Sequence, residues 1–258
     1  MTDAQNQTRF PEFRVIGITG VPEIQVGDDL PGIILAAAEG QGTPVEDGDI
    51  VVVTQKVVSK AEGALVNLAD VEPSPLALTI AGEMKDPRHV EVVLRESRRI
   101  VRMERGVLIT ETHHGLICAN AGVDASNVTG DDVLCLLPKD PDASARRIRD
   151  AVRERAGRTV AVIISDTFGR PWRVGTTDIA IGCAGIAPLK DYRGMVDRDG
   201  RTLQVSVAAV ADEAAGAAEL VTRKTIGVPV TIVRGLPYDV SEEGADVIIR
   251  EASMDLFR

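Results

Sequence analysis

Aromatic residues are scarce in this chain: phenylalanine, tryptophan and tyrosine make up 3% of the 258 residues, and Trp172 is the single tryptophan. The hydrophobic fraction of 44% is nevertheless large enough for a substantial core, which must consist mostly of Val, Ile, Leu and Ala. A ring-binding site is therefore not marked by composition, and Trp172 is the one side chain to inspect for stacking.

Basic residues are outnumbered. The 29 Lys and Arg residues face 39 Asp and Glu residues, which gives a formal net charge of −10. General nucleic-acid binding requires a basic face, so this balance argues against it. Small anionic ligands need only a local basic pocket and are not excluded.

Cysteines and long apolar runs are also few. Cys118, Cys135 and Cys183 are widely spaced and odd in number, and no CxxC or His-Cys spacing predicts zinc, so we expect reduced, buried thiols. The polar start MTDAQNQTRF lacks the apolar core of a signal peptide. No apolar run approaches the ~18 residues of a membrane span, and we expect a cytoplasmic protein that neither crosses membranes nor binds nucleic acid.

Common catalytic motifs are missing. The sequence has no GxxxxGK[ST], no GxGxxG after a strand, no GxSxG and no HExxH. Any chemistry must therefore come from other polar clusters.

The apolar periodicity predicts a mixture of helices and strands. A short antiparallel meander is expected from runs at 100–103, 107–112 and 116–120, and residues 120–128 are too rich in turn formers for regular structure. These patterns predict an α+β (mixed α/β) fold after a flexible N-terminus at 1–12. Strands are expected at 13–18, 50–54, 160–164, 179–186, 203–207 and 228–233, and helices at 33–39, 73–84, from 86 onward, 144–156 and 208–221.

The stretch VAVIISDTFGRPWRVGTTDIAIGCAGI, residues 160–186, organises the candidate chemistry. Its apolar run has the length of a buried strand, and Ser165, Asp166 and Thr167 are expected to end it. Arg170 and Arg173 follow in a loop, so the stretch suits a metal and an anion. The alternative is that Asp166 caps a turn and both arginines are solvated.

Two further polar clusters follow predicted strands. Lysines such as Lys56 and Lys60 after the 50–54 strand can neutralise phosphate oxygens, although a solvated helix start is the alternative for each residue alone. The segment NAGVDASNV contains Asp124, Ser126 and Asn127: the aspartate can ligate Mg²⁺ or Mn²⁺ through a hard oxygen and the asparagine can reach phosphate or sugar oxygens, although an Asx-turn network is the alternative. Together the clusters indicate a metal-dependent nucleotide enzyme.

Several long segments resemble one enzyme family. VVSKAEG, NAGVDASNV and DTFGRPWRVGTTDIAIGCAGI, followed by KDYRG and DRDGR, together resemble the coenzyme F420:L-glutamate ligases (gamma-glutamyl ligases). The resemblance implies a family-specific ligase fold with mixed and antiparallel sheets in an intertwined homodimer. It also implies GDP-forming, GTP-dependent addition of L-glutamate to the deazaflavin coenzyme F420-0 and then to longer gamma-linked tails. Mg²⁺ or Mn²⁺ at two sites and K⁺ are the implied cofactors.

The resemblance also implies roles for single residues. Nucleotide contacts are expected at Val21, Pro22, Glu23, Ile24, Gln55, Lys60 and Asn127, and first-metal ligands at Asp124 and Asp166. Thr167 would bind a second metal. The family's further metal segment corresponds here to residues 222–229, which contain no acid, although Lys224 can meet a phosphate.

The implied mechanism passes through an acyl phosphate, with Asp124 and Asp166 as the catalytic metal holders. Candidates for the anionic arm and for glutamate are Arg170, Arg173, Lys190 and Arg193. Two other functions stay open: a metal-dependent nucleotide phosphohydrolase and a non-catalytic nucleotide-binding protein.

The resemblance also predicts the domain organisation. Residues 13–245 would form the GTP-dependent ligase domain. Residues 246–258 would form a C-terminal tail, because EASMDLFR resembles the junction to a nitroreductase-like domain in two-domain relatives.

Overall fold

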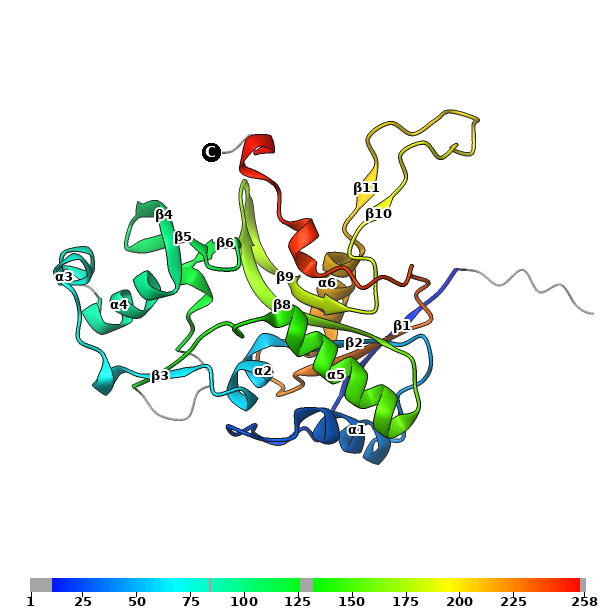
Figure 1. Cartoon of the computed structure of the whole chain (residues 1–258), viewed down its shortest axis with the longest axis horizontal. Helices are drawn as coiled ribbons and strands as arrows, with labels where there is room; N and C mark the ends of the chain where they lie inside the picture. The colour runs from blue at the N-terminus through cyan, green and yellow to red at the C-terminus, as the bar shows by residue number, and fades with distance from the viewer. Residues whose placement is uncertain (1–10, 84, 126–131, 256–258) are drawn as a thin grey trace, which may run out of the picture.

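A mixed five-stranded sheet forms the centre of the molecule (Figure 1). The structure is a computed structural model that describes residues 11–83, 85–125 and 132–255. The strand order is β1-β12-β2-β8-β9, in which β2 and β8 run parallel and every other neighbouring pair is antiparallel. The strands are β1 (Arg14–Ile18), β2 (Ile50–Thr54), β8 (Ala161–Arg170), β9 (Arg173–Ala184) and β12 (Val230–Arg234).

Helices cover both faces of this sheet. One face, called the α5 face, packs against α1 (Leu30–Gly40), α2 (Gln55–Ala61) and α5 (Pro141–Ala156). The opposite α6 face packs against α6 (Val210–Thr222). Val51 and Val53 point to the α5 face and Ile50 and Val52 to the α6 face. Because both faces are buried, the first four residues of β2, 50–53, are all apolar instead of alternating with polar residues. The combination confirms the predicted α+β class.

A smaller lobe with its own core lies beside the main sheet (Figure 1). Val90 and Val93 of one helix pack with Leu108 and Leu134 of two strands. The predicted meander is confirmed, because β4, β5 and β6 form a three-stranded antiparallel sheet. The lobe contains β3 (Leu65–Asn67), η1 (Leu68–Asp70), α3 (Pro75–Ala81), α4 (Pro87–Arg95), β4 (Ser97–Glu104), β5 (Val107–Thr112), β6 (Ile117–Ala119), η2 (Asn120–Gly122) and β7 (Val133–Cys135).

The prediction that Ser165, Asp166 and Thr167 end a strand is wrong. Strand β8 continues to Arg170, which pairs with Arg173 at the start of β9. The polar residues remain in the strand because the hydroxyl groups of Ser165 and Thr167 donate to the carboxylate of Asp178 on β9. The two strands thus form one long hairpin rather than a strand followed by a binding loop.

The predicted strand at 203–207 is also largely wrong. Of residues 203–207 only Val207 lies in a strand: β10 (Lys190–Asp191) pairs with β11 (Val207–Ala208) at the base of an arm that projects from the body (Figure 1). The alternating sequence LQVSV has no sheet face to cover it, and Val205 is 86% exposed. Alternation therefore does not produce a long strand here.

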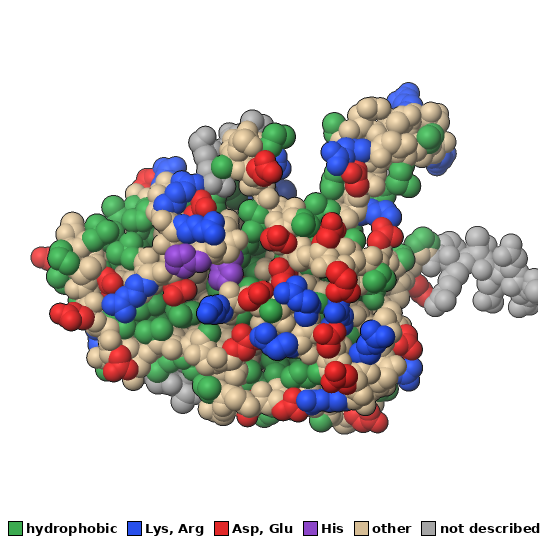
Figure 2. All heavy atoms as spheres, in the orientation of Figure 1, with side chains coloured by type: hydrophobic (Ala, Val, Ile, Leu, Met, Phe, Trp, Pro, Cys, Tyr) green, Lys and Arg blue, Asp and Glu red, His purple; other side chains and the backbone are tan. Residues whose placement is uncertain are grey.

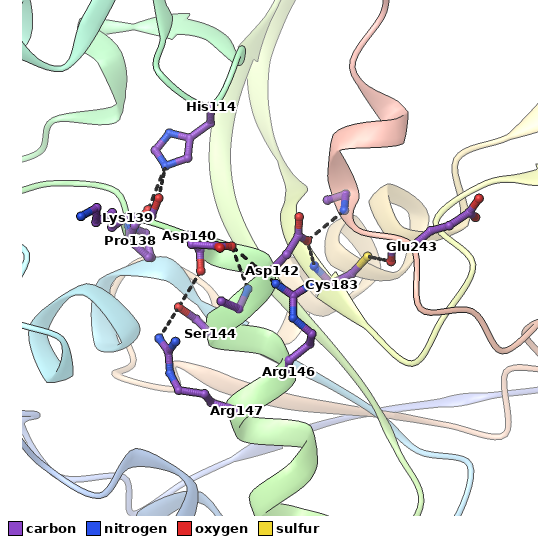
Figure 3. A network of polar contacts seen from close by, with 12 residues as sticks. His114, Pro138, Lys139, Asp140, Asp142, Ser144, Arg146, Arg147, Cys183 and Glu243 are labelled. Carbon is purple, nitrogen blue, oxygen red and sulfur yellow. Dashed lines mark hydrogen bonds and ion pairs between the residues drawn. The ribbon is translucent and has the colours of Figure 1, made fainter.

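The N-terminal end of α5 ties the sheet to the C-terminal segment (Figure 3). One carboxylate oxygen of Asp142 accepts hydrogen bonds from the backbone N–H groups of Cys183, at 2.7 Å, and Ala245, at 2.9 Å. A side chain at Gly182 would meet the backbone of Pro141 at 2.4 Å, so this close approach requires glycine. The expected domain boundary at 245 falls at the start of η3 (Ala245–Ile248), which precedes η4 (Ala252–Met254).

The remaining sequence predictions largely hold. The other predicted helices and strands are present with shifted ends, and the described part of 120–128 is a turn with Asn120 and Ala121 at positive φ. All three cysteines are buried and free, as expected. No helix in the described ranges combines the length and apolar character that a bilayer crossing requires. Acidic and basic side chains intermingle on the face shown in Figure 2.

Candidate active site

The candidate site begins where the parallel strands β2 and β8 lie side by side. Thr54, the last residue of β2, pairs with Ser165 of β8. Helix α2 starts at the next residue, Gln55, so its first turn stands at the carboxyl end of β2. The carboxyl ends of parallel strands in α/β sheets are where ligands generally bind.

Lys60 on α2 is the buried cation of this site. Its side chain is 8% exposed, and its ammonium group forms an ion pair with the carboxylate of Glu23 in the segment after β1. Gln55, one turn earlier, accepts a hydrogen bond from Ser59 at 2.9 Å. The structure thus brings Glu23 to Lys60 and places Gln55 on the same short helix, and their role as nucleotide contacts stays a prediction.

The rest of the predicted N-terminal contact segment lies next to a surface cavity. Ile24 is buried in the core and Val21 packs against that core, so their side chains serve the fold. Pro22 is exposed and lines a cavity of about 490 Å³ between this segment and α1. A ligand in this cavity would therefore meet Pro22 and the neighbouring backbone rather than the side chain of Ile24.

Asp124 reaches the site from the smaller lobe. Its backbone exchanges two hydrogen bonds with Cys135, of 3.0 and 2.8 Å, which fix its position. Its carboxylate lies 2.7 Å from the ammonium group of Lys56 on α2. The predicted metal ligand and a lysine of the predicted phosphate cluster are therefore in direct contact. Asn127 and Ser126 lie outside the described residues.

Asp166 lies on the α5 face of β8. It pairs with Ile179, which packs against the core on that face. Burial raises the pKa of Asp166 to about 7, and the carboxylates of Asp178 and Asp124 also raise it. The backbone N–H of Thr167 and the charge of Lys56 act in the opposite direction. Asp124 and Asp166 are therefore two nearby carboxyl groups, and the raised pKa of Asp166 shows that its ionised form is disfavoured. A bound cation would stabilise the ionised form of both.

The donor set formed by Asp124 and Asp166 suits one hard divalent cation. Mg²⁺ is typically held by one or two carboxylates, with the remaining positions filled by water and substrate phosphates. Within the described ranges no group of three or more His, Cys, Asp or Glu side chains is arranged around a metal position. The protein side of this site therefore suits a metal that arrives with, or completes its shell from, a phosphate ligand.

Thr167 lies on the opposite, α6 face, because neighbouring residues of a strand point to opposite sides. Its hydroxyl donates to Asp178 at 2.6 Å and accepts from the ammonium group of Lys224. Asp178 is 5% exposed and was not predicted from the sequence. A prediction of the β8–β9 register would have found it, since Asp178 lies directly across from Thr167.

The four predicted anion-binding cations are spread over two hairpins. Arg170 and Arg173 pair at the end of the β8–β9 hairpin, where both are exposed. Lys190 contacts Asp239 at 2.6 Å, and Arg193 contacts Asp191 at 2.6 Å at the base of the projecting arm. Within the described residues, no hydrogen bond or ion pair links these four to Lys60 or Asp166.

Comparisons with known proteins identify the family of this chain. The model of the F420-0:gamma-glutamyl ligase family matches residues 19–235. The chain is 44% identical to a coenzyme F420:L-glutamate ligase of Methanothermobacter thermautotrophicus, over 95% of this chain and 98% of that protein. Proteins of the same name from Methanopyrus kandleri and Haloarcula marismortui are 45% and 40% identical, over 96% and 95% of this chain and 99% and 96% of theirs.

All of the predicted nucleotide and metal residues that the structure describes fall within the matched range. The similarity also extends over nearly the whole length of each relative. This chain belongs to the F420-0:gamma-glutamyl ligase family.

Proposed function

We propose that this chain uses GTP to add L-glutamate to coenzyme F420-0, and then to the growing gamma-linked tail, with release of GDP and phosphate. Relatives named coenzyme F420:L-glutamate ligase, which match 95% and 96% of this chain, support the glutamate-ligating part of the proposal. The observation that carries it is the gathering of Lys56, Asp124 and Asp166 where β2 and β8 meet. All three substrates are anions, and this is where buried and partly buried cations meet two carboxylates.

The first step transfers the γ-phosphoryl group of GTP to the carboxylate of the coenzyme. An oxygen of that carboxylate attacks the γ-phosphorus, the bond to the β-phosphate oxygen breaks, and GDP leaves with the bonding pair. Lys60 would bind phosphate oxygens in place of Glu23, because its largely buried ammonium group already holds an anionic group of the exposed Glu23 side chain. Lys56 would likewise exchange its contact with Asp124 for phosphate oxygens when the Asp124 carboxylate binds a metal ion.

Asp124 and Asp166 would hold a divalent ion, which would supply positive charge to offset the negative charge of the phosphates. Either Mg²⁺ or Mn²⁺ fits two carboxylates with open positions. K⁺ is part of the proposal through the family resemblance. It is tested by replacing K⁺ with Na⁺ at constant ionic strength.

The second step forms the amide. The amine of L-glutamate attacks the acyl carbon, the bond from that carbon to the phosphate oxygen breaks, and the nitrogen loses a proton. A carboxylate does not react with an amine unaided because its oxygen is a poor leaving group, and phosphorylation removes that obstacle. Arg170, Arg173, Lys190 and Arg193 remain the proposed contacts for the anionic substrates.

We also propose that the chain acts as a homodimer in the cytoplasm, where GTP and glutamate are available. Apolar side chains on the β8–β9 hairpin and on the projecting arm support an interface: Trp172, Val174 and Val205 are 85%, 100% and 86% exposed. Large exposed apolar side chains on projections are typical of contact surfaces. The double change Val174→Asp and Val205→Asp should convert a dimeric mass in light scattering to a monomeric one.

The activity test is mass spectrometry of the coenzyme after incubation with GTP, L-glutamate and Mg²⁺ or Mn²⁺. We expect a mass increase of one or more glutamyl residues, with one GDP formed for each. Asp166→Asn should abolish the product, whereas Asp150→Asn on the exposed side of α5 should not. GDP without glutamylated coenzyme would instead indicate a phosphohydrolase, and GTP binding without GDP would indicate a binding protein.

A further inference from the structure

The place expected for a second metal holds a lysine. The resemblance assigns Thr167 to that metal, yet the Thr167 hydroxyl already has two partners. It donates its proton to Asp178, at 2.6 Å, and accepts a hydrogen bond from the Lys224 ammonium group. A metal ion coordinated to this oxygen would have to occupy the direction that the ammonium group fills.

The acidic partner of this arrangement is buried and well held. Asp178 is 5% exposed and also accepts a hydrogen bond from Ser165 at 3.2 Å. Its backbone N–H donates to Glu219 of α6 at 2.9 Å. A buried carboxylate needs a compensating cation, and Lys224 supplies one through the Thr167 hydroxyl.

Lys224 is positioned by the end of α6. Helix α6 ends at Thr222, whose hydroxyl bonds to Ala218 at 2.9 Å, and Arg223 follows with φ at 49°. This left-handed residue turns the chain so that Lys224 reaches β8. The lysine itself is exposed, so its ammonium group remains accessible to a ligand.

The two expected metal positions also lie on different sides of the sheet. Asp166 points to the α5 face, whereas Thr167 and Asp178 lie on the α6 face, separated by the strand backbone. Segment 222–226, TRKTI, adds two positive charges and no carboxylate to the α6 side. At Thr167 the Lys224 ammonium group would repel a second divalent ion at short range, and it already supplies the cation beside the Asp178 carboxylate.

We propose that the Lys224 ammonium group is a built-in cation that replaces a second divalent ion, so that each chain works with a single Mg²⁺ or Mn²⁺. This inference rests on the proposed function for the identity of the metal, but the number of bound ions can be measured without turnover. Lysine is a compact point charge with three donors, so its ammonium group can balance the buried carboxylate of Asp178 through the Thr167 hydroxyl.

The experiment counts Mn²⁺ ions. The protein is saturated with a non-hydrolysable GTP analogue, Mn²⁺ is added, and ions retained with the protein after ultrafiltration are counted per chain. We expect one ion in the wild type and two in Lys224→Glu, because the glutamate supplies an oxygen ligand beside Thr167 and Asp178. Lys139→Glu, a change at an exposed lysine before α5, is the matched control and should retain one ion.

Two ions in the wild type would overturn the inference, as would one ion in both the wild type and Lys224→Glu. Failure of the proposed function looks different. In that case the ion counts follow the expectation while the wild type forms no glutamylated coenzyme. Thermal unfolding of each variant, compared with the wild type, verifies that the counts come from folded protein.

Discussion

The ammonium group of Lys56 lies 2.7 Å from a carboxylate oxygen of Asp124, although the two residues come from different lobes of the molecule. The side chains are 25% and 38% exposed, so water screens the pair only in part. A cation of the protein thus already holds the carboxylate that is proposed to bind a metal. Metal and lysine must compete for Asp124.

Replacing Lys56 by Met should therefore tighten Mn²⁺ binding to the nucleotide-free protein. Removing one nearby positive charge at a partly exposed site is worth about 1 kcal/mol, which corresponds to a gain of roughly fivefold in affinity. A Mn²⁺ titration followed by electron paramagnetic resonance measures the change. Lys139→Met is the control, and an unchanged or weaker affinity in Lys56→Met would contradict the competition.

The ionisation of Asp166 predicts a pH dependence of stability in the metal-free protein. Burial raises the pKa of this carboxyl from its ordinary 3.8 to about 7. The folded chain therefore holds a proton that the unfolded chain releases, and stability falls as pH rises from 3.8 to about 7. Below that pH range Asp166 is protonated in both the folded and the unfolded chain. Above it, the full free-energy cost of ionising the buried carboxyl group lowers the stability.

Asp166→Asn removes this titration. We expect the variant to be more stable than the wild type by about 1–3 kcal/mol at pH 8, and the difference to vanish near pH 4. Urea unfolding in the presence of a chelator at the two pH values measures it. A constant difference across the range would show that the substitution acts through packing and not through charge.

The strands of the main sheet could largely be predicted from the sequence because their apolar runs are unambiguous. The predicted range of β2, 50–54, is the observed one. The extension of β8 was missed for a physical reason: Ser165, Asp166 and Thr167 look like turn formers until their partner Asp178 is known. Local propensity does not contain that cross-strand pairing.

The candidate site was predictable in composition but not in geometry. Lys60, Asp124 and Asp166 were all selected from the sequence, and the structure places them around the end of β2. The side of the sheet on which each residue lies was not predictable, because it depends on β8 continuing through residues 166 and 167. The contact between Lys224 and Thr167 joins segments far apart in the chain, which spacing cannot show.

Lys60 provides a test of the nucleotide site. Lys60→Met keeps the length of the side chain but removes its charge, and we expect GTP affinity to fall by about 10- to 100-fold, because a charge-assisted contact is worth roughly 1.5–3 kcal/mol. Glu23→Gln is the matched control: it breaks the same ion pair but keeps the cation. We expect its affinity to stay within about threefold of the wild type, as a rim charge on its own contributes little. Isothermal titration with a GTP analogue compares them, and equal losses would assign the effect to the ion pair instead.

Asp142 provides a test of how the C-terminal segment is held. Its carboxylate accepts the N–H groups of Cys183 and Ala245, and thereby joins α5, β9 and η3 (Figure 3). Asp142→Ala leaves both N–H groups without this acceptor, so the free energy of unfolding should fall by about 2–4 kcal/mol. The control is Asp150→Ala, because among the described ion pairs the Asp150 carboxylate contacts only the neighbouring Arg149. This change should alter the free energy of unfolding by less than about 1 kcal/mol.

Urea unfolding and limited proteolysis together separate two explanations of a loss at Asp142. If the carboxylate holds the segment after residue 240 in place, Asp142→Ala should expose that segment to cleavage before the sheet unfolds, because Ala245 loses its tie to α5. Asp142→Asn retains an acceptor oxygen and should lie between the wild type and the alanine variant in both measurements. A global loss of stability without early cleavage would instead place the main effect at Cys183, on the sheet side of the same carboxylate.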